Sequence, residues 1–94
     1  IQNQEQQLSI GMSRLAKERS SLEILQSKNQ EILLSEEELL KMFQDGYKIA
    51  NINLLQLQEI KNKVISTKRT LIQIKTALDQ NTITQNYNQG QYND

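Results

Sequence analysis

Hydrophobic residues in the first half of the chain recur at the spacing of a helix with one buried face. The members of this stripe are Leu8, Met12, Leu15, Leu22, Leu25, Ile32, Leu39 and Phe43. Their steps of three, four and seven residues are typical of a helix that packs along one side. The pattern predicts a first helix over residues 8–44.

The second half carries a more regular stripe. Its members are Leu57, Ile60, Val64, Thr67, Leu71, Ile74 and Leu78. They alternate steps of three and four without a break, which is the seam of a coiled coil. The pattern predicts a second helix over residues 54–84, followed by a turn-rich tail over residues 85–94. We expect Leu25, Ile32, Leu39 and Phe43 of the first helix to face Leu57, Ile60, Val64, Leu71, Ile74 and Leu78 of the second.

Both halves also carry apolar residues that lie off these stripes. They are Ile10, Ile24 and Leu34 in the first half and Leu54, Ile65, Ile72 and Ile83 in the second. A helix with two apolar lines packs on two sides, which predicts neighbours beyond the partner helix of the hairpin. The alternative is that these side chains are simply exposed to solvent, as single hydrophobic residues often are.

A short tip at residues 45–53 separates the two stripes. Gly46 follows the first stripe at a point where glycine readily ends a helix. Asn53 precedes the second stripe and can cap the helix that starts there. A connector this short makes the two helices antiparallel neighbours. The predicted fold of residues 1–94 is all-α, a single long antiparallel two-helix coiled-coil hairpin that associates into a larger helical bundle or barrel.

Composition excludes several kinds of chemistry. The sequence has no histidine and no cysteine, so the usual nucleophile and metal sites cannot be assembled from it. Glu36, Glu37 and Glu38 point about 100° apart on a helix and cannot converge on one ligand. The basic residues of the second half are spread without interleaved aromatic residues, which argues against nucleic-acid binding. We therefore expect no catalytic activity, no cofactor and no metal.

Charge is balanced overall but not along the sequence. Residues 1–46 carry five basic and eight acidic groups, a net charge of −3, and residues 47–94 carry six and three, a net charge of +3. Opposite signs suit an antiparallel pair of helices. No apolar run approaches the roughly 20 residues of a membrane-spanning helix. Because the sequence begins at Ile1 without a methionine, we expect it to be a piece of a longer protein.

Residues 43–58, FQDGYKIANINLLQLQ, resemble the helix, tight tip and leucine-rich helix start of the TolC-type outer-membrane efflux family. Residues 81–94, NTITQNYNQGQYND, resemble the segment where the second helix of such a hairpin runs back toward the middle of the channel. The resemblance implies a trimeric parent channel with two hairpins per subunit, in which this hairpin is part of a periplasmic tunnel wall at the outer membrane of a Gram-negative cell. Its implied partners are other copies of the parent subunit and a periplasmic adaptor protein. The sequence has none of the family's membrane barrel strands, so we expect no direct membrane insertion by this part.

The resemblance also assigns adaptor docking to the tip. The residues concerned are Tyr47, Lys48, Ile49, Ala50, Asn51, Ile52 and Asn53. Ala50 departs from the family, which usually has a second glycine there, and this weakens the match in tip geometry. Tyr47 and Ile52 are expected to fold back onto Phe43 and Leu55, which leaves Ile49 as the better docking candidate.

Two other functions fit the same stripes. A free-standing coiled-coil scaffold or oligomerisation module needs only the seam, without a transport role. A segment of a filament, tail or fusion-type coiled coil would carry similar stripes. The capped tip is the feature that favours the channel.

Overall fold

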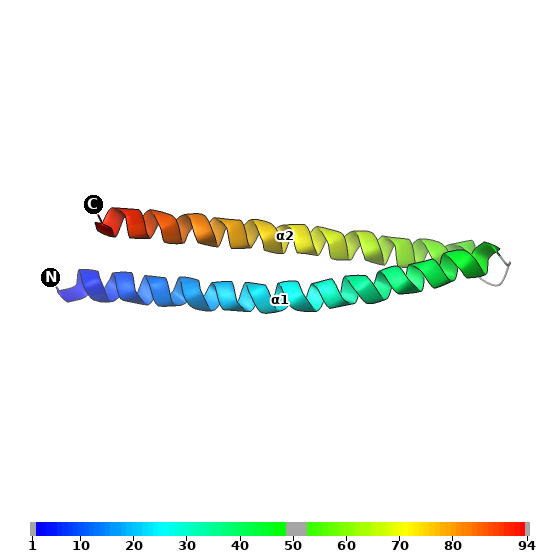
Figure 1. Cartoon of the computed structure of the whole chain (residues 1–94), viewed down its shortest axis with the longest axis horizontal. Coiled ribbons are helices and arrows are strands. Elements are labelled where there is room, and N and C mark those ends of the chain that lie inside the picture. Colours follow the sequence, from blue (N-terminus) through cyan, green and yellow to red (C-terminus); the bar gives the residue numbers. More distant parts are fainter. Residues whose placement is uncertain (1, 49–52, 94) are drawn as a thin grey trace.

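The computed structural model describes the backbone of residues 2–48 and 53–93, and the surroundings of the side chains of residues 10–46 and 53–89. Helix α1 spans Gln2–Lys48 and helix α2 spans Leu54–Asn93. They run antiparallel and wind gently about each other, with both termini at the same end (Figure 1). The molecule measures 72 × 17 × 15 Å, and its length matches that of a continuous helix of 47 residues. The predicted all-α hairpin is confirmed.

The helix boundaries differ from the sequence prediction at three places. Helix α1 starts at Gln2 instead of residue 8, and it passes through Gly46 to end at Lys48. The prediction that Gly46 ends the helix is therefore wrong. A glycine inside a helix costs only about 1 kcal/mol, which packing of the helix against a partner can offset. Helix α2 continues to Asn93, through the segment 85–93 that its composition suggested as a turn. No proline interrupts it, and α1 lies alongside as far as the open end.

Asn53 caps the start of α2, as the sequence suggests. The backbone N–H of Gln56 donates to Asn53 Oδ1 over 2.8 Å, and that of Leu57 donates to the Asn53 carbonyl over 3.3 Å. An asparagine at this position satisfies a backbone donor that would otherwise lack a partner. The cap fixes the residue at which α2 begins.

The seam of α2 follows the sequence prediction closely. Its buried hydrophobic residues are Leu57, Ile60, Val64, Ile74 and Leu78, and Leu71 is half-buried. Thr67, within the same line, is also half-buried. Asn81 follows Leu78 by three residues, so it continues the line, and it is buried. The line that faces α1 is therefore the predicted one, extended by a buried asparagine.

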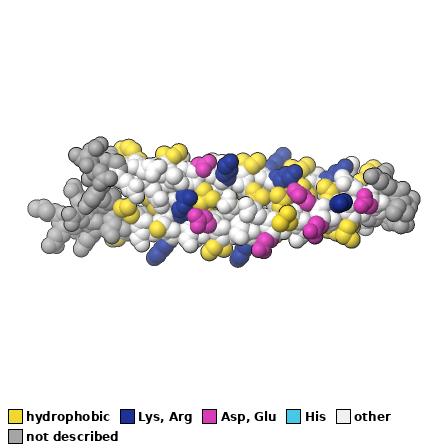
Figure 2. All heavy atoms as spheres, in the orientation of Figure 1, with side chains coloured by type: hydrophobic (Ala, Val, Ile, Leu, Met, Phe, Trp, Pro, Cys, Tyr) yellow, Lys and Arg dark blue, Asp and Glu magenta, His cyan; other side chains and the backbone are white. Residues whose placement is uncertain are grey.

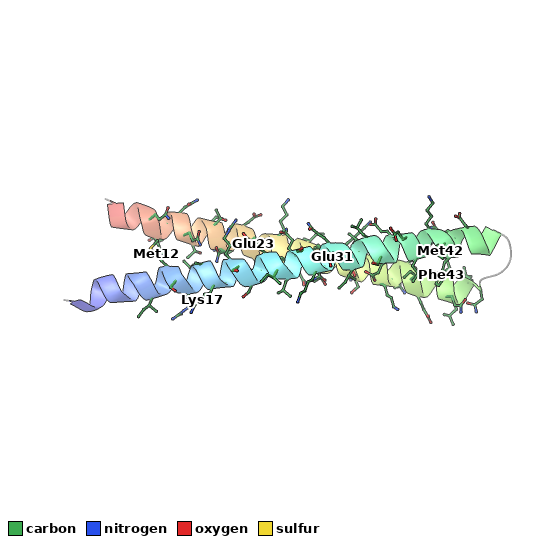
Figure 3. The ribbon with its side chains drawn as sticks, turned by 60° about the horizontal axis from the view of Figure 1, so that its bottom comes forward. Met12, Lys17, Glu23, Glu31, Met42 and Phe43 are labelled. Carbon is green, nitrogen blue, oxygen red and sulfur yellow. The ribbon has the colours of Figure 1, made fainter. Side chains whose placement is uncertain are left out.

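The seam of α1 differs from the prediction. Leu25, Ile32 and Leu39 are exposed, so their assignment to the seam is wrong. The half-buried line that faces α2 consists of Leu15, Arg19, Leu22, Gln26, Asn29, Leu33, Glu36, Leu40 and Phe43. In Figure 3, Phe43 points toward α2 and Lys17 points away from it. Several members of the line are polar or charged, and their long side chains can lay methylene groups over α2 while the polar ends reach out.

Hydrogen bonds between the helices set the register. Thr67 Oγ1 donates to Glu36 Oε1 in the half nearer the tip. Farther along, Arg19 Nη1 donates to Thr82 Oγ1 over 2.7 Å, and Asn81 Nδ2 donates to the Leu15 carbonyl over 3.0 Å. Residues of α1 and α2 whose numbers add to roughly 100 therefore lie at the same level along the hairpin. Residue 39 is therefore level with the region of residues 60–64.

Candidate functional site

A polar layer crosses the seam near the open end of the hairpin. Arg19 donates to Thr82 across the seam, and its Nε lies 3.1 Å from a carboxylate oxygen of Glu23, one turn farther along α1. Thr82 in turn donates to the Leu78 carbonyl over 3.1 Å. Arg19 is thus held between an acidic neighbour on its own helix and a hydroxyl on the other. The layer ties the two helices together where the apolar seam of α2 ends.

Asn81 belongs to the same layer and is 2% exposed. Its amide nitrogen bonds to the Leu15 carbonyl, while its Oδ1 is buried without a hydrogen-bond partner. A single buried asparagine in a coiled coil lowers stability but disfavours other registers, because any slip would leave the amide without its partner. Asn81 therefore specifies how the two helices align.

Three large hydrophobic residues form an exposed line along one side of α1, which we call the α1 flank. They are Leu25, Ile32 and Leu39, and each directly precedes one of the seam residues Gln26, Leu33 and Leu40. Leu25 and Ile32 are 48% and 49% exposed, so about half of each residue is already covered. The α1 flank lies beside the seam and not opposite it.

Helix α2 carries a second exposed line, the α2 flank, formed by Ile65 and Ile72. Each directly follows a seam residue, Val64 or Leu71. In an antiparallel pair, the residues before seam positions share one side and the residues after them share the other. The α1 and α2 flanks therefore lie on opposite sides of the hairpin. Ile72 is 64% exposed and Ile65 is 49% exposed, so both offer apolar surface to a neighbour.

Charged residues border both flanks, mostly acidic ones on α1, where Lys28 is also present, and basic ones on α2. Glu31 and Glu38 directly precede Ile32 and Leu39 on α1, whereas Lys61 and Lys68 lie four residues before the isoleucines of the α2 flank. A shallow groove around Ile32 is lined by Lys28, Glu31, Ile32, Ser35 and Glu36. Figure 2 shows hydrophobic side chains that reach the surface along the hairpin among acidic and basic ones. Within residues 10–46 and 53–89, the only ion pair is that of Arg19 with Glu23, so these bordering charges are unpaired in the hairpin.

The predicted docking tip falls mostly outside the described residues. Ile49, Ala50, Asn51 and Ile52 lie there, and so does the expected packing of Ile52 onto Leu55. Tyr47 and Lys48 form the last residues of α1, but the surroundings of their side chains are not described. Asn53 acts as the helix cap. The docking assignment of the tip remains a prediction.

The described residues hold no group of three or more acidic side chains that could bind a metal ion. In the same part of the protein, neither helix has a stretch long and apolar enough to cross a membrane. Sequence reasoning missed Arg19, Asn81 and Thr82. The available signal was positional, because Asn81 continues the seven-residue spacing of Thr67 and Ile74.

Comparisons with protein-family models, with curated proteins and with solved structures gave no match. The resemblance to the TolC-type family therefore rests on residues 43–58 and 81–94 alone.

Proposed function

We propose that the hairpin is a structural element that packs sideways into a larger helical assembly. The observation that carries this proposal is the pair of apolar flanks, which remain exposed although the seam between α1 and α2 is already filled. The flanks differ from scattered surface hydrophobic residues because their members repeat every seven residues, the spacing of a further helix contact. Covering the exposed part of a leucine or isoleucine contributes about 1 kcal/mol, so several together can hold a neighbour.

The resemblance gives this proposal a specific form, the periplasmic tunnel wall of a trimeric efflux channel with the tip docked to an adaptor protein. In that form each hairpin needs neighbours on both sides, which the two flanks on opposite sides would provide. A free-standing scaffold or oligomerisation module uses the same flanks and no tip contact. Neither form calls for catalysis, a cofactor or a metal.

The general proposal is tested by making the flanks polar in the 94-residue protein. We expect the unaltered protein to self-associate with rising micromolar concentration in sedimentation velocity experiments. A variant with Ile32→Gln, Leu39→Gln, Ile65→Gln and Ile72→Gln should stay monomeric with unchanged helicity by circular dichroism.

The matched control is Ile10→Gln with Ile83→Gln, which alters two exposed isoleucines outside the flanks. This control should associate normally. An unaltered protein that remains a monomeric hairpin at every concentration would refute the proposal.

The channel form has a separate test at the tip. In an efflux channel that carries this hairpin, Ile49→Asp with Asn51→Asp should abolish efflux, because two new charges would oppose an apolar docking contact. The helicity and melting temperature of the hairpin should change little. Full transport by this variant would remove the docking role and favour the scaffold.

A further inference from the structure

We propose that the α1 flank of one copy of the hairpin packs against the α2 flank of a second copy, with the two hairpins in the same orientation and at the same level. This inference rests on the proposed sideways packing and names its partner. It has two independent supports, the spacing of the apolar residues and the signs of the bordering charges.

The apolar residues of the two flanks interdigitate when the copies lie at the same level. By the register of the hairpin, Ile72 is level with residue 28, halfway between Leu25 and Ile32 of α1. From the three hydrogen bonds taken together, Ile65 is level with residue 35, about midway between Ile32 and Leu39. Ile65 and Ile72 of one copy thus lie opposite the spaces between successive residues of the α1 flank of the other copy. Alternation of this kind is how side chains of packed helices fit together.

Charges at the edges of the flanks match in the same arrangement. By the register that the three hydrogen bonds give together, Lys68 is level with Ile32 and so lies near Glu31 of the other copy, and Lys61 is level with Leu39 and lies near Glu38. These four charged side chains are without an ion pair in the part of the hairpin that is described. Helix α1 carries six basic and eight acidic residues and α2 carries five and two, so the helices have net charges of −2 and +3. Complementary charge selects a partner and its orientation more than it adds affinity.

The main competing arrangement pairs two α1 flanks. Leu25, Ile32 and Leu39 are evenly spaced about Ile32, so two antiparallel copies would also fit by shape. That arrangement places Glu38 of one copy level with residue 26 of the other, and it brings the two Glu31 carboxylates to almost the same level at the centre of the contact. Like charges at a close contact disfavour it. The unlike flanks give a contact between two different surfaces, which can repeat from copy to copy into a closed ring or an open row.

Charge reversal tests the pairing directly. One variant, the α1 reversal, carries Glu31→Lys with Glu38→Lys, and the other, the α2 reversal, carries Lys61→Glu with Lys68→Glu. Each variant alone should self-associate roughly tenfold more weakly than the unaltered protein, because its two flanks then bear like charges. An equimolar mixture should recover the original association, because every contact between the two variants has opposite charges. Circular dichroism checks that both variants keep the helicity of the unaltered hairpin.

The outcomes separate this inference from the proposed function. If the α2 reversal associates as well as the unaltered protein, α2 takes no part in the contact and the inference fails, although sideways packing stands. If the unaltered protein does not associate at all, both fail.

Disulfide formation supplies a second readout, because the protein has no cysteine of its own. A variant with Glu31→Cys and Lys68→Cys should give a ladder of dimers, trimers and larger species on oxidation, since each copy offers one cysteine to each neighbour. Within one hairpin these two cysteines cannot meet, because residue 31 borders the α1 flank and residue 68 borders the α2 flank, and the two flanks lie on opposite sides of the hairpin. Dimers formed by Glu31→Cys alone, at the yield of the double variant, would overturn the inference in favour of paired α1 flanks.

Discussion

The two helices contribute unequally to the seam that joins them. Within residues 10–46 and 53–89, every buried residue lies on α2, and the facing residues of α1 are only half-buried. The α2 line includes compact residues such as Val64 and Thr67, whereas the α1 line includes long ones such as Arg19 and Glu36. Long side chains cover a smaller partner and remain exposed at their own ends. Helix α2 therefore supplies the buried residues of the seam, and the side chains of α1 cover them.

This inequality predicts where truncation is costly. Ile60 is 3% exposed, so Ile60→Ala should lower the free energy of unfolding by about 2–5 kcal/mol through lost burial and a cavity. Leu25→Ala removes a similar side chain from an exposed position of α1 and should cost about 0.5 kcal/mol. Denaturant unfolding at low protein concentration measures both. Equal losses would mean that Leu25 is packed as closely as Ile60, contrary to its exposed position beside the seam.

Asn81 is the polar residue that ends the apolar seam of α2 toward the open end of the hairpin, and replacing it with an apolar residue would extend that seam. Asn81→Leu removes a buried amide oxygen that has no partner and should stabilise the hairpin by about 1–2 kcal/mol. The same change should relax the alignment of the helices, because the bond to the Leu15 carbonyl is lost. Cysteine pairs across the seam would detect it as crosslinks in more than one register. A variant less stable than the unaltered protein would show that the amide contributes more than its burial costs.

Gly11 provides the smallest expected effect and concerns α1 alone. A Cβ built at this position meets nothing within 4 Å. Gly11→Ala should therefore raise the free energy of unfolding by about 0.5–1 kcal/mol, since alanine loses less conformational entropy in a helix. A small rise in melting temperature checks this. No rise would indicate that the start of α1 adds little to the folded state.

The sequence was sufficient to predict the seam of α2. Apolar residues occupy nearly every seam position from Leu57 to Leu78, and Thr67 is the single polar exception. Steps of three and four lead from each to the next without a rival line of equal length. Periodicity alone therefore finds the face of α2 that packs on α1.

The sequence was insufficient for the seam of α1, because two neighbouring lines compete there. The predicted line of Leu25, Ile32 and Leu39 and the observed line of Gln26, Leu33 and Leu40 both give steps of three and four when combined with positions 22, 29, 36 and 43. Of these four positions, the prediction included only Leu22 and Phe43. The predicted line is entirely apolar, so periodicity favours it. The observed line continues to Arg19, whose hydrogen bond to Thr82 depends on which α2 residue lies opposite. Spacing along one helix holds no information about that contact.

The helix ends show the same limit. Gly46 and the segment 85–93 resemble helix ends when only local preferences are considered, yet both are helical beside a partner. Asn53 was predictable because a cap depends only on the residues that follow it directly. The apolar residues of the flanks were visible in the sequence, but their placement on opposite sides required the observed seam.

Both termini lie at one end of the hairpin, and this decides how it would respond to a pulling force (Figure 1). Tension applied between the two ends would peel the helices apart one layer at a time, beginning at the open end, instead of loading all layers together. The layer of Arg19, Asn81 and Thr82 would then meet the force before the apolar layers around Ile60. Hydrogen bonds act over a short distance, so the bonds of this polar layer would oppose separation of the helices only over a small extension and would then break together. The helices would thus separate progressively from the open end, with the first marked resistance at this polar layer.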